Sequence, residues 1–179
     1  MTSSEHVSDV VAELAATRGQ DLVTLAYLMC GDGHEAEDIV QAVFARLLGS
    51  PAIGGADNAF AYAKRAVTNE FLDRRRRLQR RAKALVLLRG EPTTTGSAET
   101  SVADRDALLR AFCVLKAKER ACIVLRYYGD WDAGSIAGAI GTTPATVRSV
   151  ISRALPRLRD ALETSAAEPP TEPGTGADR

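Results

Sequence analysis

Hydrophobic residues recur every three or four positions along most of this chain, which is the spacing of one buried face on an α-helix. The clearest case is His34–Leu48, whose acidic residues also stand in the first turn, where the helix dipole favours them. The same period predicts helices over residues 8–28, with a break near Gly19, and over Ala59–Leu88. Few aromatic residues and abundant alanine and leucine agree with an all-α fold. The apolar face of His34–Leu48 consists of Ala36, Ile39, Val40, Val43, Phe44 and Leu47.

Segments rich in glycine, proline and small polar residues divide these helices into two groups. Gly31–Gly33 predicts a turn and Gly49–Asn58 a loop, whereas Glu91–Ser101 has the composition of a flexible linker. We therefore predict two small helical domains joined by a flexible linker, with frayed residues before Ser8. The expected division is a first domain over 8–89, a linker over 90–104, a second domain over 105–163 and a disordered tail over 164–179.

The pattern of Ala133–Arg159 predicts two helices around a tight turn. Gly141 ends the first helix and can supply a left-handed cap, Thr143 caps the next helix, and Pro144 takes its first position. This order is typical of a helix-turn-helix, whose second helix enters the major groove of DNA. An αα-hairpin with a solvated basic face is the alternative. The second helix has an apolar stripe of Val147, Val150, Ile151 and Leu155, and an opposite face of Arg148, Ser149, Ser152, Arg153 and Arg157.

The formal net charge is zero, yet charge is distributed very unevenly. Residues 1–57 hold nine acids and two bases, a net charge of −7, whereas residues 59–89 hold ten bases and two acids, a net charge of +8. Such asymmetry indicates two different partners, an anion for the basic segment and a basic protein surface for the acidic one. Solvation is the plain alternative for both charged surfaces.

The basic segment combines cations with aromatic rings. Its arginine run extends over several helical turns, long enough to follow a phosphate backbone, and the binding would depend on salt. Phe60 and Tyr62 are equally compatible with core packing and with stacking on unpaired bases, whereas Phe71 favours the core. Asn69 can read a base edge through its amide or be an ordinary surface residue.

Nothing in the sequence points to catalysis or to a resident metal. The three cysteines Cys30, Cys113 and Cys122 form no paired ligand motif, and Cys30 with His34 supplies too few ligands for zinc. We expect buried free thiols in a reducing cytoplasm. No phosphate loop or nucleophile pattern is present, so we expect no enzyme, no cofactor and no small-molecule substrate. With no signal peptide and no apolar run of about 18 residues, we expect a cytoplasmic protein without a membrane span.

Three features in one order resemble a known family. They are the acidic helix AEDIVQAVFARL, the basic segment RAVTNEFLDRRRR after a loop, and the segment LRYYGDWDAGSIAGAIGTTPATVRSVISRALPRLR. Together they resemble an extracytoplasmic-function (ECF) sigma factor of the sigma-70 family, of the actinobacterial SigE-like group. The resemblance covers about Val10–Leu162. It implies a region 2 domain that binds the β′ coiled coil of RNA polymerase and melts the −10 promoter element. It also implies a region 4 domain that binds the β flap and reads the −35 element.

The resemblance also assigns site residues by position. The loop Gly49–Asn58 would receive a flipped −10 base, and the linker would thread toward the polymerase active site. The polymerase-binding residues would be Glu37, Asp38, Gln41 and Phe44. Those for the −10 element would be Asn58, Phe60, Tyr62, Lys64, Arg65, Asn69, Arg74, Arg75, Arg76 and Arg77. Those for the −35 element would be Thr143, Thr146, Arg148, Ser149, Ser152, Arg153 and Arg157.

Some positions depart from the family pattern. Lys116 follows Leu115 where proline is usual, Ser135 stands where glutamate is common, and Tyr62 is near the place of a common tryptophan. Pro156 lies inside the recognition helix, and its ring should clash with the carbonyl of Ser152 and kink the axis. Base reading would then occur before the kink, with Arg157 and Arg159 left for phosphates or the flap.

The implied function is therefore that of a sigma factor, which directs core RNA polymerase to promoters and initiates transcription there. An anti-sigma factor is a further partner that the resemblance allows. The alternative is a free-standing helix-turn-helix regulator that binds operators without polymerase. Such a regulator normally dimerises on paired half-sites, and the chain shows no heptad pattern or spare apolar helix for that.

Overall fold

The computed structural model describes residues 3–54, 58–89 and 103–167, and these residues form helices without any β-strand. Four helices belong to the N-terminal half: α1 (Ser3–Cys30), α2 (Gly33–Leu48), α3 (Pro51–Gly54) and α4 (Ala59–Arg89). The other four are α5 (Ala103–Cys113), α6 (Ala117–Tyr127), α7 (Ala133–Ile140) and α8 (Pro144–Ala167). The all-α prediction is confirmed. None of the helices in these ranges is long and apolar enough to cross a membrane.

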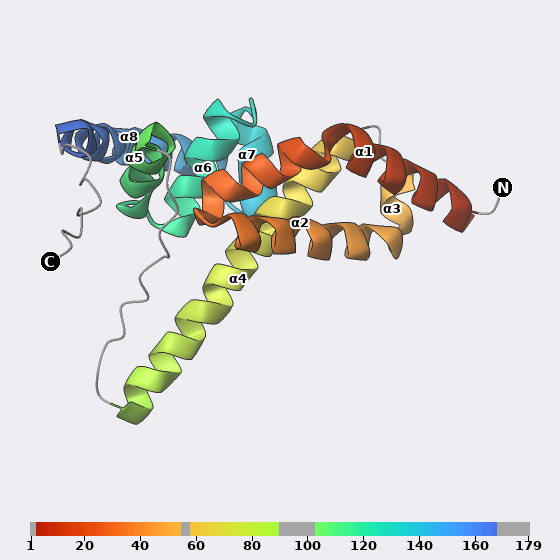
Figure 1. The fold of residues 1–179 in the computed structure, drawn as a ribbon, viewed down its shortest axis with the longest axis horizontal. Helices are drawn as coiled ribbons and strands as arrows, with labels where there is room; N and C mark the ends of the chain where they lie inside the picture. Colours follow the sequence, from red (N-terminus) through yellow and green to blue (C-terminus); the bar gives the residue numbers. More distant parts are fainter. Residues whose placement is uncertain (1–2, 55–57, 90–102, 168–179) are drawn as a thin grey trace, which may run out of the picture.

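The N-terminal helices pack α1 against α2, α3 and α4, as Figure 1 shows. Gly31 adopts a positive φ of 82° between α1 and α2, and Asp32 then caps α2 by accepting a hydrogen bond from the Glu35 N–H at 2.7 Å. The core between the helices is mainly apolar, because each helix turns its hydrophobic stripe inward, although Thr68 and Glu70 of α4 are buried as well. Its largest buried members are Phe71, Leu22, Leu25, Met29, Ile39, Leu47 and Ile53.

Three local predictions in this half are wrong. Helix α1 passes through Gly19 without a break, because one glycine costs only about 1 kcal/mol and the packing of Leu22 and Leu25 outweighs it. Helix α1 also begins at Ser3 rather than after residue 7, and Val7 is buried. Part of the predicted loop Gly49–Asn58 is the short helix α3, whose Ile53 fills the core; residues 55–57 lie outside the described ranges.

The C-terminal helices form a second group in which α8 packs on α5, α6 and α7. Asp132 caps α7, which begins at Ala133, by accepting a hydrogen bond from the Ser135 N–H at 2.6 Å. Gly141 ends α7 in the left-handed conformation, with φ 66° and ψ 57°, and Thr143 accepts from the Thr146 N–H at 3.2 Å. The predicted cap residues of the turn are therefore confirmed.

Two boundaries differ from the prediction or fall outside the described ranges. Helix α8 extends to Ala167, so residues 164–167 of the expected tail are helical, and residues 168–179 are outside the description. Most of the expected linker, residues 90–102, is likewise outside it. Pro156 lies inside helix α8, as the sequence indicated.

The two groups of helices touch each other. Contacts join α1 to α6, and α4 to both α6 and α7. Only the first half of α4 takes part, and its second half projects away from the body of the molecule (Figure 1). The chain therefore presents one exposed helical rod and a junction between its two halves.

Candidate nucleic-acid interface

The start of α8 presents a polar, cationic face to solvent. Val147 and Ala154 are buried against the other C-terminal helices, which fixes the rotation of α8 about its axis. Of the predicted apolar stripe, Val147 is fully buried, whereas Val150, Ile151 and Leu155 are only half-buried. The residues that remain exposed on the opposite face are Thr143, Thr146, Arg148, Ser149, Ser152 and Arg153. This is the arrangement by which a recognition helix offers its first turns to the major groove.

Two local contacts organise that face. The hydroxyls of Thr143 and Thr146 lie 2.9 Å apart at the first turn. The Arg153 side chain donates from Nε to the Ser149 carbonyl at 3.2 Å, so its guanidinium lies along its own helix. Arg148 is exposed without an ion pair among the described residues, which leaves its guanidinium available for a base edge or a phosphate.

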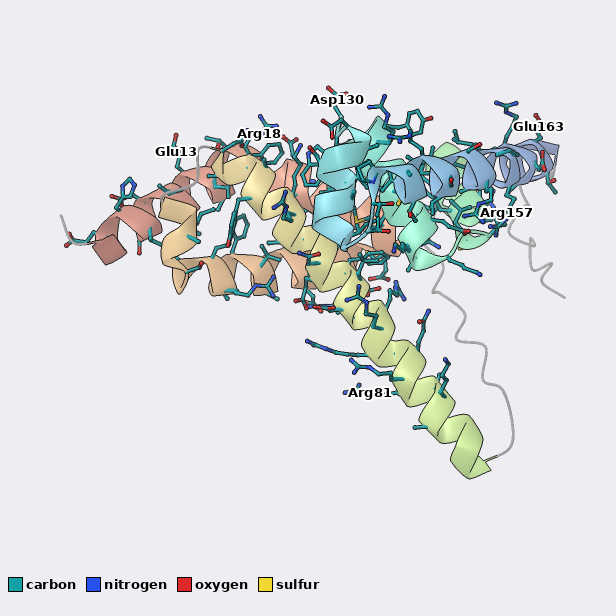
Figure 2. All side chains as sticks on the ribbon, turned by 180° about the vertical axis from the view of Figure 1, so that it is seen from behind. Glu13, Arg18, Arg81, Asp130, Arg157 and Glu163 are labelled. Atoms are coloured by element: carbon teal, nitrogen blue, oxygen red, sulfur yellow. The ribbon has the colours of Figure 1, made fainter. Side chains whose placement is uncertain are left out.

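Arg157 does not belong to this face. Its guanidinium forms an ion pair with Glu119 at 3.0 Å and also donates to the carbonyl of Val114. Burial opposes the charge on Glu119, but hydrogen bonds from the Lys116 N–H and from Arg157 outweigh it and lower the pKa of Glu119. Arg157 therefore fastens the middle of α8 to the α5–α6 corner, on a side of the domain that Figure 2 shows facing α5 and α6. These contacts engage the Arg157 guanidinium on the α5–α6 side of α8, and its part in reading the −35 element stays a prediction.

The cations of α4 separate into two classes. Arg74 and Arg75 point into the body: Arg74 pairs with Glu70 at 3.0 Å, and Arg75 pairs with Glu35 at 2.8 Å. Arg76 pairs with Asp73 at 2.8 Å on the surface. Arg77 has no such partner among the described residues. The exposed cations on the projecting half of α4 are Arg77, Arg80, Arg81 and Lys83, and Figure 2 labels Arg81 among them.

Glu70 explains why the arginine run is not uniformly available. Its side chain is almost buried and accepts hydrogen bonds from Arg74 at 3.0 Å and from Arg46 at 3.2 Å. Burial alone would raise the pKa of Glu70, yet the two guanidinium groups lower it. Arg74 also donates to the Asp38 carbonyl at 3.1 Å, so it ties α4 to α2. The resemblance assigns Arg74 to the −10 element, although its spacing from Glu70 already fits an ion pair one helical turn apart; only the packing of α2 on α4 brings Arg46 near Glu70.

Residues near the start of α4, including the aromatic Phe60, also form contacts within the protein. Asn58 caps the helix by accepting a hydrogen bond from the Ala61 N–H at 2.8 Å. The Phe60 ring carries the Arg18 guanidinium 3.9 Å from its centroid and the Lys64 ammonium 4.9 Å from it. Phe60 and Tyr62 are both half-buried, so their exposure favours neither core packing nor stacking on unpaired bases, the two alternatives that the sequence left open. Arg65 and Asn69 are exposed.

The predicted polymerase-binding face on α2 is open to solvent. Glu37, Asp38 and Gln41 are exposed, and Phe44 is half-buried beside them. Leu48, which the sequence analysis did not single out, is 51% exposed and lies four residues after Phe44 on the same helix face. A large exposed apolar residue next to acidic ones is a feature of protein interfaces.

The three cysteines differ in their exposure to solvent. Cys30 and Cys122 are buried, and burial raises the pKa of each thiol to about 11. Cys113 is exposed, so the expectation of three buried thiols is wrong at this position. Across the described ranges, no group of three or more histidine, cysteine or acidic side chains is arranged to hold a metal ion.

Comparison with known protein families matches both halves of the chain. The Sigma-70 region 2 family matches residues 14–81, and the Sigma-70 region 4 family matches residues 105–158. The chain belongs to the sigma-70 family. The region 2 match runs from α1 to the projecting half of α4, and the region 4 match runs from α5 to Leu158 in α8.

Relatives of known name agree with this membership. The chain is 33% identical over 156 residues to the RNA polymerase sigma-E factor of Streptomyces antibioticus, covering 85% of this chain and 84% of that protein. It is 31% identical over 142 residues to the ECF RNA polymerase sigma factor SigL of Mycobacterium tuberculosis, covering 77% and 80%. The resemblance to actinobacterial ECF sigma factors is thereby confirmed.

A solved structure shares the fold of this sigma-70 family member. It is the sigma factor RpoE of Bartonella quintana, in complex with the anti-sigma factor NepR. The TM-score is 0.67 and the sequence identity 23%, and the match covers 87% of this chain and 97% of that one. The likeness extends over both helical halves.

Proposed function

We propose that this sigma-70 family chain is a promoter-recognition subunit of RNA polymerase, which binds the core enzyme and initiates transcription at specific promoters. The observation that carries the proposal is the pairing of two sigma regions in one chain, each with an exposed surface of the expected kind. Region 4 offers the first turns of α8, and region 2 offers the projecting cationic half of α4. The partners are core RNA polymerase and promoter DNA, and the site of action is the cytoplasm.

For the −35 element, the proposed readers are Arg148, Ser149, Ser152 and Arg153, with Thr143 and Thr146 at the entry to the helix. These six residues are exposed on the first three turns of α8, which is the part of a recognition helix that reaches base edges. Arg157 is left out because its ion pair with Glu119 holds it against the protein.

For the −10 element, the proposed surface includes fewer residues of the arginine run than the sequence indicated, and it continues along the projecting half of α4. Arg77, Arg80, Arg81 and Lys83 are exposed and follow one another along the rod, as phosphate contacts require. Phe60, Tyr62, Lys64, Arg65 and Asn69 remain candidates near the base pocket, and Asn58 supports them as a helix cap. Flipping a base costs a few kcal/mol, so a pocket and a backbone clamp must act together.

For core polymerase, the proposed contact is the exposed face of α2, formed by Glu37, Asp38, Gln41 and Phe44 and extended by Leu48. Acidic and apolar side chains in one stripe suit a basic helical surface such as the β′ coiled coil. The β flap is the proposed partner of region 4. An anti-sigma factor is a further proposed partner, supported by the shared fold with an RpoE captured in such a complex. No catalytic activity is proposed.

Transcription in vitro with purified core polymerase tests the proposal. We expect the chain to direct initiation from a subset of promoters in a genomic fragment library, and core polymerase alone to give none of these starts. A variant with Asp38→Arg on α2 is the control for core binding. Operator-like binding by the free chain, with no core-dependent start on any fragment, would instead identify a free-standing regulator.

A further inference from the structure

Helix α1 has one cation within the stripe of residues that it turns toward the core. Arg18 stands between Leu14 and Leu22, where the three- and four-residue spacing of the stripe predicts an apolar side chain, and it is exposed. A charged residue that interrupts a buried stripe departs from the rule that the rest of the helix follows, and such departures concentrate at functional sites. The other members of the stripe, all buried, are Val7, Val11, Leu14, Leu22, Leu25 and Met29.

The guanidinium of Arg18 lies on an aromatic ring of α4. It is 3.9 Å from the centroid of the Phe60 ring, in the first turn of that helix, and Figure 2 labels Arg18 where α1 passes the beginning of α4. A planar guanidinium at this distance covers the face of the ring as a stacked aromatic group would. Because the Arg18 side chain is 48% exposed, a planar molecule from solvent can reach this face by displacing it.

A second cation lies near the same ring. The Lys64 ammonium is 4.9 Å from the Phe60 centroid. Burial lowers the pKa of Lys64, and the charge of Arg18 lowers it further, against the opposite effect of Asp130. The two cations therefore repel each other, and an anion bound beside both would relieve that repulsion. The present partner of Arg18 is Asp21 at 2.7 Å, in an ion pair that water screens because both side chains are about half exposed.

An aromatic face next to two cations fits one unpaired nucleotide of a DNA strand. Proteins hold single strands in this way, with a base stacked on a ring and the phosphate bound by a cation. Phe60 follows two residues after Asn58, which caps α4 and ends the segment predicted to receive a flipped −10 base. In the free chain, the guanidinium of Arg18 occupies the ring face that such a base would use.

We propose that Arg18 belongs to the −10 reading surface and changes its position when DNA binds. In the free chain it covers the Phe60 face; when an unpaired base stacks there, the guanidinium moves from the ring to a phosphate of the same strand. Arginine suits both positions, because its guanidinium stacks on rings and binds phosphate through two N–H groups. The inference rests on the proposed function and adds a DNA contact from α1, in the acidic part of the chain.

The salt dependence of DNA binding tests the phosphate contact. The protein is the core-bound chain, and the probe is promoter DNA with an unpaired −10 strand, taken from a start that the transcription assay identifies. One phosphate contact with a single strand contributes about 0.7 to the slope of log affinity against log salt. Arg18→Gln should reduce the slope by this amount, whereas Arg18→Lys keeps the charge and should keep the wild-type slope.

Arg18→Met separates a DNA contact from a structural role. Methionine completes the apolar stripe of α1, so this variant should keep or raise the melting temperature followed by far-UV circular dichroism. It should nevertheless reduce the salt slope as Arg18→Gln does. If Arg18→Gln loses helical signal, Arg18→Met carries the test alone.

Abasic nucleotides test the movement of the guanidinium. Each base of the −10 strand is removed in turn, and the base that stacks on Phe60 is the one whose loss weakens binding by wild type but not by Phe60→Leu. That loss should be about 5-fold to 160-fold for wild type. On this abasic strand the guanidinium stays on the ring, so wild type and Arg18→Gln should have equal salt slopes. A slope difference as large as on the intact strand, or no such base, would refute the movement.

Arg46→Gln is the matched control. Arg46 is the other basic residue of residues 1–57, and it pairs with Glu70 at 3.2 Å instead of lying on a ring. Its loss changes the net charge equally and should leave the salt slope unchanged. Equal slope reductions for Arg46→Gln and Arg18→Gln would attribute the effect to net charge and refute the Arg18 contact, as would an unchanged slope for folded Arg18→Met.

Core-dependent initiation by wild type is measured separately. Initiation with equal slopes for wild type and Arg18→Met refutes only the Arg18 contact. Absence of initiation on every fragment refutes the proposed function. The free-chain variants are then compared on a thymidine oligonucleotide and on the same strand without bases, where a slope difference confined to the strand with bases supports the Arg18 site and equal slopes refute it.

Discussion

Arg75 and Arg77 are chemically identical and two residues apart, yet the structure gives them opposite roles. Arg75 donates to Glu35 at 2.8 Å and to the Cys30 carbonyl at 3.3 Å, and its guanidinium lies 5.5 Å from the centroid of the Phe71 ring. Arg77 is exposed on the projecting half of α4. We predict that Arg75→Gln lowers the stability of the fold, whereas Arg77→Gln lowers the affinity for DNA.

The size of the stability loss follows from the three contacts of Arg75. The ion pair is worth about 1 kcal/mol, because the side chains of Arg75 and Glu35 retain 31% and 24% exposure and water screens them. The hydrogen bond to Cys30 adds about 0.5–1 kcal/mol, and the contact with the Phe71 ring adds about as much. Arg75→Gln should therefore cost about 2–3 kcal/mol, or about 4–10 °C in Tm. Arg77→Gln should stay within about 0.5 kcal/mol of wild type.

Two measurements on the same pair of variants check this reasoning. Urea unfolding followed by circular dichroism gives the free energy of unfolding, and binding of labelled promoter DNA by the core-bound protein at several salt concentrations gives the salt dependence. Arg77→Gln should reduce the slope of log affinity against log salt by about 0.7–0.9, the value of one phosphate contact. The reasoning is refuted if Arg75→Gln keeps wild-type stability and reduces that slope instead.

Three further predictions concern other surfaces. Arg148→Ala should weaken discrimination between correct and altered −35 sequences by about 1–3 kcal/mol in competition binding, and an equal loss on all sequences would make it a phosphate contact. The folded-state pKa of Glu70 is lowered, so its contribution to stability is present above the ordinary glutamate pKa of about 4.3 and is lost as pH falls through the folded value. Urea unfolding measured between about pH 6 and about pH 3 should therefore show a smaller loss of unfolding free energy on acidification for Glu70→Gln than for wild type. Asp38→Arg should reduce the affinity for core polymerase in a pull-down with an unchanged dichroism spectrum, while the control Glu163→Arg on exposed α8 should not; equal affinities for the two variants would remove α2 from the interface.

Arg157 shows how a cationic face can be divided between binding and support. Its spacing from Arg153 places Arg157 on the same side of α8. The corner between α5 and α6 packs against that part of α8, however, and Glu119 and the Val114 carbonyl accept hydrogen bonds from Arg157. The same helix therefore exposes its N-terminal cations and uses a later one as a tether. This agrees with base reading near the start of α8, before Pro156.

Local rules predicted the features that depend on a few neighbouring residues. The left-handed cap at Gly141, the hydroxyl cap at Thr143 and the amphipathic helix α2 each follow from side chains within about one turn, and the structure confirms them. The predicted break at Gly19 is wrong, because the packing of the 28-residue helix α1 outweighs the local free-energy cost of one glycine. The prediction that Cys113 is buried is wrong for a similar reason, since the exposure of this residue depends on what α5 packs against.

The all-α fold, the helix-turn-helix, the charge asymmetry and the sigma-family order of motifs could all be predicted from the sequence, because each depends on periodicity, caps and composition along one stretch of chain. Tertiary packing sets which distant acids face the arginines of α4, leaves Leu48 exposed beside Phe44 on α2, and brings Lys64 and Arg120 into hydrogen bonds with the other half of the chain. Several of these pairings join residues 24 to 91 positions apart, such as Arg46 with Glu70 and Met29 with Arg120, whereas Arg74 and Glu70 are only four positions apart. A charge has no preference among distant partners until the packing of apolar faces brings one of them within hydrogen-bond distance.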